Sequence, residues 1–189
     1  MSMPSRLLTY LVLALPALWM AAMLAGGASV SDLVHPTGEW SARLIVLALL
    51  LGPLRDIFGP SRWIAWLIRR RRAIGVAAFL YAAAHTVFYL VDMRTLAFVL
   101  AEIDAPGIWT GWLALLVMVP MAATSNEAAM RLLRRNWKRV QRLAYPLGVL
   151  TLVHWWLIDY GSLDTIWTFA PLGVAWIARA VVKFRSLQS

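Results

Sequence analysis

Two of the three histidines in this chain lie in the middle of long apolar segments, where ionisable side chains are rare and usually functional. His85 comes thirteen residues after Arg72, and His154 comes twelve residues after Arg142. If both segments are helices that cross a membrane outward from these arginines, a rise of about 1.5 Å per residue puts both imidazoles roughly 18–20 Å from the same surface. Two imidazoles at matched depth on neighbouring helices can bind one metal ion between them.

The surroundings of the two histidines favour one class of metal site. Neither segment offers a carboxylate at that depth, and zinc or non-haem iron needs more protein ligands than two imidazoles. A porphyrin supplies four nitrogens itself, and an iron with two axial histidines has no open position, so it transfers electrons and does not activate oxygen. The alternative is that each imidazole only hydrogen-bonds to a neighbouring helix. The spacing favours haem and leaves both interpretations open.

Small and aromatic residues near the histidines suit a flat macrocycle. Alanines precede His85, and a glycine on the other segment allows close approach. Aromatic side chains then follow each histidine and can pack on the ring edges. These residues are Ala82, Ala83, Ala84 and Gly148, followed by Phe88, Tyr89, Trp155 and Trp156.

The third histidine, His35, stands in the stretch HPTGEW, which we expect to be an outer loop before the second apolar segment. Histidines in such loops are commonly solvated or cap a helix, so we assign His35 no ligand role. The chain contains no cysteine. Disulfides, iron–sulfur clusters, thiolate catalysis and cysteine-ligated zinc are therefore excluded.

The elements that position these histidines are expected to be membrane helices. Hydrophobic residues make up 61% of the 189 positions and charged residues 14%, with a mean hydropathy of +0.70. A soluble domain averages roughly 45–50% apolar and about 25% charged residues. A helix needs about 20 apolar residues to cross a bilayer. We predict an all-α, single-domain bundle over residues 1–189 with six transmembrane helices, at 6–26, 40–58, 73–92, 108–125, 143–160 and 164–182.

The distribution of charge predicts the orientation of this bundle. In a six-helix arrangement, sixteen of the eighteen Lys and Arg residues fall on the side that holds both termini, and seven of the nine acids fall on the other. The positive-inside rule then puts both termini in the cytoplasm. The same rule accounts for the net charge of +9 without a nucleic acid partner.

The segments between the predicted spans carry fewer signals. We expect 126–142 to form one basic amphipathic helix along the cytoplasmic face, and 94–105 to lie on the outer surface. The arginines of 69–72 and 134–142 either enforce topology or attract an anionic phosphate or a donor protein. No internal repeat is evident. No G-x-G-x-x-G motif is present, so we expect electrons to come from another molecule and not from an attached nicotinamide domain.

Two long stretches resemble a known family. They are LGPLRDIFGPSRWIAWLIRRRRAIGVAAFLYAAAHTVFYLVD and ATSNEAAMRLLRRNWKRVQRLAYPLGVLTLVHWWL. Together they are similar to the MsrQ family, haem-binding membrane subunits of bacterial periplasmic methionine sulfoxide reductase systems, within the ferric reductase-like transmembrane domains. The resemblance implies that His85 and His154 are the axial ligands of an outer b-type haem. It also implies a location in lipid in the bacterial inner membrane.

The resemblance further implies a route for electrons. The quinone pool or a cytoplasmic flavin reductase would donate them, and the acceptor would be MsrP, a soluble periplasmic molybdopterin enzyme that reduces methionine sulfoxide. The chain would thus be an electron-transfer subunit with no catalytic residue of its own. FMN is also associated with the family, although no contacts for it can be assigned in this sequence.

One position departs from the family pattern. Members usually have a histidine where this chain has Gln141 in VQRLAY, and in the wider superfamily that histidine helps to hold a second haem nearer the cytoplasm. An amide is a poor iron ligand, and the matching position on the third span is Arg72. We therefore expect one haem b.

Other functions remain open at this stage. The nearest is a quinone-linked cytochrome b that serves another periplasmic acceptor. A transporter with proton-relaying histidines would be expected to have acidic residues inside its spans, whereas every carboxylate here lies at or near an interface. A non-redox scaffold is the third alternative, and both non-redox alternatives predict a colourless protein.

Overall fold

The computed structural model describes residues 3–186, and all the regular secondary structure in that range is helical. The prediction of an all-α fold is confirmed. The helices are α1 (Met3–Ala25), α2 (Ser31–Phe58), α3 (Arg62–Ile68), α4 (Arg71–Asp92), α5 (Leu96–Ala101), α6 (Pro106–Ala123), α7 (Glu127–Leu133), α8 (Arg135–Gln141), α9 (Ala144–Ile158) and α10 (Leu163–Ser186).

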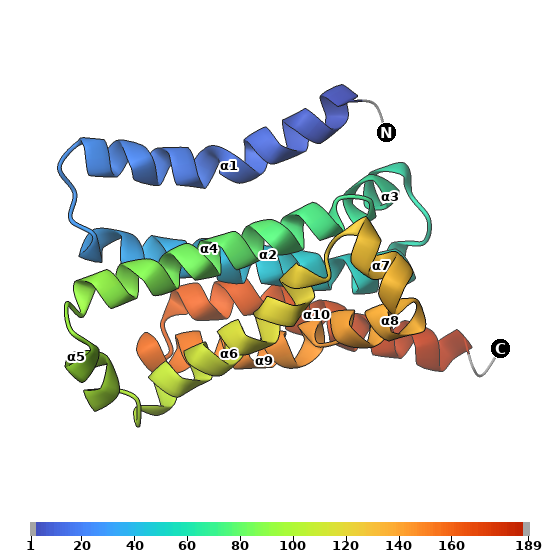
Figure 1. Ribbon diagram of the computed structural model, residues 1–189. Helices are drawn as coiled ribbons and strands as arrows, with labels where there is room; N and C mark the ends of the chain where they lie inside the picture. Colours follow the sequence, from blue (N-terminus) through green and yellow to red (C-terminus); the bar gives the residue numbers. More distant parts are fainter. Residues whose placement is uncertain (1–2, 187–189) are drawn as a thin grey trace.

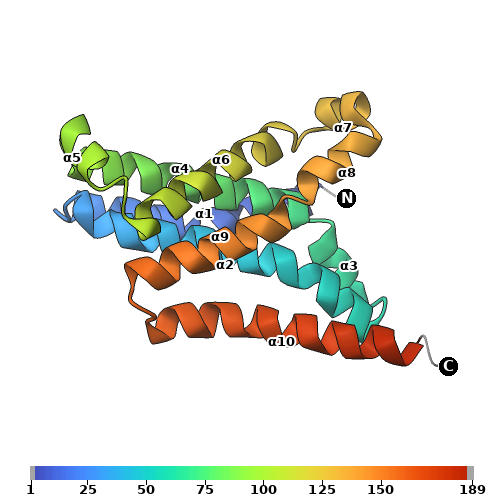
Figure 2. The same cartoon turned by 90° about the horizontal axis from the view of Figure 1, so that it is seen from below.

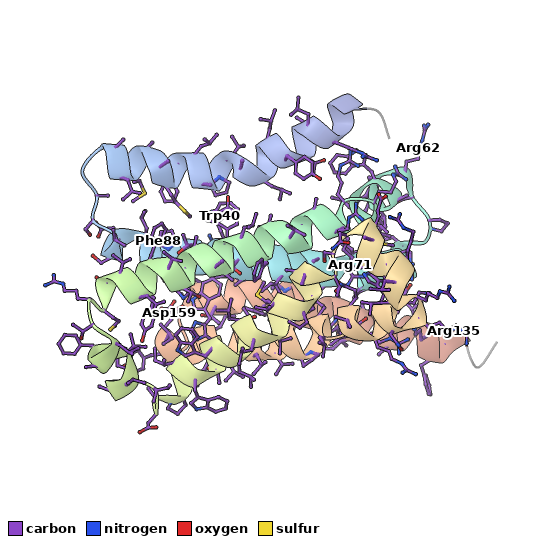
Figure 3. All side chains as sticks on the ribbon, in the orientation of Figure 1. Trp40, Arg62, Arg71, Phe88, Arg135 and Asp159 are labelled. Atoms are coloured by element: carbon purple, nitrogen blue, oxygen red, sulfur yellow. The ribbon has the colours of Figure 1, made fainter. Side chains whose placement is uncertain are left out.

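The long helices run side by side along one direction, and the short helices lie at the two ends of the bundle (Figure 1). The start of α1 and the end of α10 lie at the same end as α3, α7 and α8, whereas α5 lies at the opposite end. Figure 3 shows Arg62, Arg71 and Arg135 at the first end and Asp159 at the second. The structure therefore segregates charge along the axis of the bundle, as the sequence predicts.

Helix α2 is the centre of the bundle. It packs against α4, α10 and α9, and α6 packs chiefly against α9. Figure 2 shows α10 at one edge of the bundle, beside α2. Leu33, Leu49 and Leu51 of α2 are at most 2% exposed. The buried side chains of α2 are mostly apolar, as expected for a helix packed against several others.

Close packing and buried polar contacts hold the helices together, because lipid removes most of the hydrophobic driving force between membrane helices. The hydroxyl of Ser41 on α2 donates to the carbonyl of Ala78 on α4 at 2.9 Å. A Cβ atom on Gly148 of α9 would lie 2.6 Å from a methyl of Leu49. Glycine at 148 therefore lets α9 approach α2. We had expected Gly148 to make room at the histidine site, but it is not among the residues that line it.

Four helices of the described chain are long and apolar enough to cross a membrane: Arg6–Ala25, Arg71–Asp92, Pro106–Ala123 and Leu163–Arg185. Large apolar side chains on these helices are exposed, for example Leu80, Leu116 and Val174, each at least 61%. Such surfaces suit contact with lipid. The remaining two predicted spans correspond to the central helix α2 and to α9, which is 15 residues long. The count of six spans stays a prediction.

The second predicted span begins too late. Helix α2 starts at Ser31 and not near residue 40, so His35 lies on a helix and the expectation of a loop was wrong. The Asp32 carboxylate accepts hydrogen bonds from the backbone N–H and the hydroxyl of Ser29, at 2.8 and 2.7 Å. An acidic side chain at a helix start is favourable, and the helix continues through Pro36.

The segment 126–142 forms two short helices and not one. The break falls at Arg134, whose φ is +46°. The side chain of Asn126 accepts from the N–H of Ala129 at 2.8 Å and begins α7. The indole N–H of Trp137 on α8 donates to the carbonyl of Thr124 at 2.9 Å. This hydrogen bond holds α8 against the end of α6. That contact requires the chain to turn between α7 and α8.

Candidate functional site

The structure brings the two membrane histidines together. His85 on α4 and His154 on α9 have ring centroids 6.2 Å apart, and their planes are inclined by 77°. They line one cavity together with residues of α2 and α6. The cavity has a volume of about 130 Å³. The equal depth read from the sequence therefore corresponds to a shared site.

Both imidazoles are held through the same ring nitrogen. Nδ1 of His85 lies 2.8 Å from the carbonyl oxygen of Val34, and Nδ1 of His154 lies 2.6 Å from that of Gly107. A carbonyl oxygen can only accept, so Nδ1 carries the proton in both rings. Nε2 is then left with a free lone pair, which is the state of a histidine that binds a metal.

The separation of the rings tests whether an iron porphyrin fits. A metal ion that binds both imidazoles would lie between the two rings. The ring centroids lie 6.2 Å apart, which leaves room for one ion between them. Within residues 3–186, no three His, Cys, Asp or Glu side chains converge as a metal site. The donor set thus suits a metal that brings its other ligands with it.

The wall of the cavity is mostly apolar and comes from four helices. Of the flanking residues that we expected, Ala82, Tyr89 and Trp155 line it. Ala83, Ala84, Phe88 and Trp156 are not among its lining residues. The sequence analysis missed the contributions of α2 and α6, which include Gly38, Ala42, Ile45, Gly111, Ala114 and Met118. The recurrence of the dipeptide Thr-Gly at 37–38 and 110–111 was a signal that could have indicated two of them.

His35 lies at the edge of the same cavity, although we assigned it no role. Its Nε2 is 3.2 Å from Oε1 of Glu39, and Oε2 of Glu39 is 2.8 Å from Arg43. The side chain of His35 is 58% exposed, whereas that of Glu39 is 16% exposed. The three residues follow one another at intervals of four on one face of α2, beside the site.

Gln141 lies beside a second, smaller cavity nearer the arginine-rich end. Its amide nitrogen donates to the carbonyl of Met121 and to the hydroxyl of Thr124, both at 3.2 Å. This cavity has a volume of about 60 Å³, and no histidine is among its lining residues. The two cavities share Ile45 and Met118, so they follow one another along the bundle. Gln141 therefore links α8 to α6.

Comparison with known proteins identifies the family. The model of the ferric reductase like transmembrane component matches residues 37–163, which include both histidines. A haem-binding subunit MsrQ of protein-methionine-sulfoxide reductase from Rhizobium meliloti (strain 1021) is 34% identical over 158 residues, covering 80% of this chain and 71% of the relative. The chain belongs to the MsrQ proteins of the ferric reductase-like transmembrane family.

Other MsrQ proteins are more similar over a shorter length. Those of Xanthomonas campestris pv. campestris (strain 8004) and Xanthomonas oryzae pv. oryzae (strain MAFF 311018) are 41% and 40% identical over 137 residues. The alignments cover 70% of this chain and 61% of each relative. The chain thus spans about three fifths of the length of these Xanthomonas proteins. No solved structure matches the chain. Family membership and the apolar helices make this MsrQ-family chain a membrane protein.

Proposed function

We propose that this MsrQ-family chain carries electrons through the bacterial inner membrane by way of one haem b, with His85 and His154 as its axial ligands. The observation that carries the proposal is the pair of neighbouring imidazoles in one cavity, 6.2 Å between centroids, each with Nδ1 bonded to a backbone carbonyl. The names of the relatives, which describe haem-binding subunits, agree with it.

The chain's own residues bind and orient the cofactor. Haem, when bound, supplies reversible one-electron chemistry at its iron. His85 and His154 would hold the haem iron. The carbonyls of Val34 and Gly107 fix the two rings, and apolar side chains such as Ile45 exclude water from the site.

The acceptor that we propose is a periplasmic catalytic subunit of the MsrP type, which would use the electrons to reduce methionine sulfoxide in oxidised proteins. The relatives are subunits of protein-methionine-sulfoxide reductases. The cavity reaches Tyr89, whose hydroxyl donates to Glu102 beyond the end of α5 at 3.3 Å. The site therefore approaches the end of the bundle that we assign to the periplasm.

The donor would act at the opposite end. The quinone pool or a cytoplasmic flavin reductase is the source that family resemblance favours, and FMN belongs to the same proposal. Five cations gather there in a concave surface, formed by Arg134, Arg135, Lys138, Arg139 and Arg142. Such a surface favours anionic groups.

This function requires electrons to cross the bilayer, and a six-helix topology provides the route. We propose that α2 and α9 span the membrane beside the four candidate spans. Helix α2 has 28 residues, enough for about 42 Å at 1.5 Å per residue. Helix α9 lies along α6, which is itself a candidate span.

The test is the dithionite-reduced minus oxidised absorption spectrum of the detergent-purified protein, with a pyridine haemochrome count. We expect a sharp low-spin b-type spectrum and about one haem per chain. A colourless protein after expression with adequate haem would overturn the proposal, and two haems per chain would overturn its stoichiometry. Reoxidation of the reduced protein by purified MsrP then separates the proposed acceptor from a quinone-linked cytochrome b that serves another one.

A further inference from the structure

The two imidazoles are held by the same local structure, which occurs once on α2 and once on α6. On α2, the carbonyl of Val34 accepts from His85, and Thr37 and Gly38 follow three and four residues later. On α6, the carbonyl of Gly107 accepts from His154, and Thr110 and Gly111 again follow three and four residues later in the sequence. Both stretches lie near the start of their helix.

Each glycine makes room for one imidazole. A Cβ atom on Gly38 would lie 3.0 Å from Nδ1 and 3.1 Å from Cε1 of His85. A Cβ atom on Gly111 would lie 2.7 Å from Cε1 and 2.8 Å from Nδ1 of His154. Both glycines are inside helices, where glycine is otherwise unfavourable. The absence of a side chain lets each ring reach the helix backbone.

Each threonine contacts the carbonyl that the imidazole uses. The Thr37 hydroxyl lies 2.8 Å from the oxygen of Val34 and 2.7 Å from that of Leu33. The Thr110 hydroxyl lies 2.9 Å from the oxygen of Gly107 and 2.7 Å from that of Pro106. Both side chains are buried, at 1% and 3% exposure. A hydroxyl that bonds back to these carbonyls bends a helix locally and tilts them away from its axis.

We infer that Thr37-Gly38 and Thr110-Gly111 are two equivalent cradles that set the tautomer and the orientation of His85 and His154. These four are positioning residues, since they act on the haem through the imidazoles. The inference rests on the proposed haem function and adds to it a reason for the near-perpendicular ring planes, inclined by 77°. Perpendicular axial imidazoles give ferric haem a strongly anisotropic low-spin EPR spectrum, whereas parallel ones give a rhombic spectrum.

The test replaces the glycines one at a time in the full-length protein. Gly111→Ala is expected to lose most of the haem, or to retain it with a changed EPR spectrum, because the new methyl meets the His154 ring. Gly38→Ala is expected to act in the same direction but more weakly, because its closest contact is longer. The matched controls are Gly52→Ala on α2 and Gly173→Ala on α10, where a Cβ would meet nothing within 4 Å.

The redox midpoint potential gives a second readout. A bond from Nδ1–H to a carbonyl makes an imidazole a stronger donor to iron and favours the ferric state. Weakening that bond should raise the midpoint potential of any haem that Gly38→Ala retains. Unchanged haem content, EPR anisotropy and potential in both alanine variants would overturn the inference. Circular dichroism and gel filtration identify a variant that has merely failed to fold, in which case the milder Gly38→Ala decides.

The threonines are tested separately. Thr37→Val and Thr110→Val keep the side-chain shape but remove the hydroxyl, so they should shift the EPR spectrum and the potential, whereas Thr37→Ser and Thr110→Ser should retain the wild-type values. Valine variants identical to wild type would remove the threonines from the inference. If the wild-type protein itself held no haem, the proposed function would fail. A normal wild-type spectrum with insensitive glycine variants would overturn the cradles alone.

Discussion

At the residue scale, the two nitrogens of each imidazole have different roles in the site. Nδ1 is committed to a backbone carbonyl in both His85 and His154, and this leaves Nε2 for a ligand. Gly38 and Gly111 leave room for the imidazoles to reach these carbonyls, and both lie on different helices from the histidines. A substitution at either histidine should therefore remove iron ligation without removing the helix packing around it.

We expect His85→Ala and His154→Ala each to lose most of the haem, because one imidazole cannot hold a six-coordinate centre. Haem per chain and the reduced-minus-oxidised spectrum measure the loss. The matched control is His35→Ala, which removes the exposed histidine at the edge of the cavity and should leave the haem content close to that of the wild type. A normal low-spin spectrum in both ligand variants would refute the assignment.

The two histidines could be predicted from the sequence because they combine two strong signals, a polar group in an apolar segment and equal distance from an arginine run. Their partners could not. Val34 and Gly107 contribute only backbone oxygens, which carry no sequence signal. Gly38 lies in the stretch HPTGEW, which we expected to be a loop, and only the folded α2 shows that it lies against His85.

At the scale of elements, α1 is attached to the bundle through one side chain in particular. The hydroxyl of Tyr81 on α4 donates to the carbonyl of Leu13 at 2.8 Å and accepts from the N–H of Ala17 at 3.0 Å. These two groups are four residues apart, so they would otherwise bond to each other within the helix. Tyr81 thus inserts into the backbone ladder of α1, next to Pro16.

Tyr81→Phe should loosen this attachment while leaving the haem site intact. Loss of the hydroxyl removes two hydrogen bonds, each worth about 1 kcal/mol. Amide hydrogen exchange should become faster in α1 around Leu13 to Ala17, and the haem spectrum should not change. The matched control is Tyr145→Phe on α9, whose ring lies 6.3 Å from that of Trp176 on α10 and is tilted by 47° to it. Equal exchange in wild type and Tyr81→Phe would contradict the role of Tyr81.

The boundaries of the elements were predictable only where apolar segments end in charges. The span predicted at 73–92 agrees closely with α4, which ends at Asp92. The break at Arg134 was not predictable, because it depends on the contact between Trp137 and the carbonyl of Thr124 at the end of α6. Contacts between segments distant in the sequence override local helix preference at such points.

At the scale of the whole molecule, the bundle contains two similar helix pairs that are not recognisable as a repeat in the sequence. Helices α2 and α4 form one pair, and α6 and α9 form another; in each pair, a carbonyl near the start of the first helix meets a histidine on the second. The only residues that the two pairs share in this arrangement are a Thr-Gly dipeptide and a histidine, too few for a sequence repeat to be recognised. The likeness lies in backbone geometry.

The orientation of the whole molecule can be tested because the chain has no native cysteine. We expect Ser29→Cys and Ser162→Cys to react with a membrane-impermeant thiol reagent from the periplasm. Cysteines at Ser61 and Ala128 should react only after the membrane is opened. The pair at 29 and 61 brackets α2, and the pair at 128 and 162 brackets α9. Labelling of both members of a pair from one side would show that the bracketed helix does not cross.

The placement of the two histidines also has a consequence for biosynthesis. His154 follows His85 by 69 residues, so a ribosome releases the two ligands at different times. The first helix pair can insert and pack before the second has been made, yet it offers iron a single imidazole. If His85 and His154 are the haem ligands, as we propose, haem capture must wait for α9, and a chain interrupted before that helix would not retain the cofactor. Loading with haem therefore reports that translation and insertion have proceeded through α9.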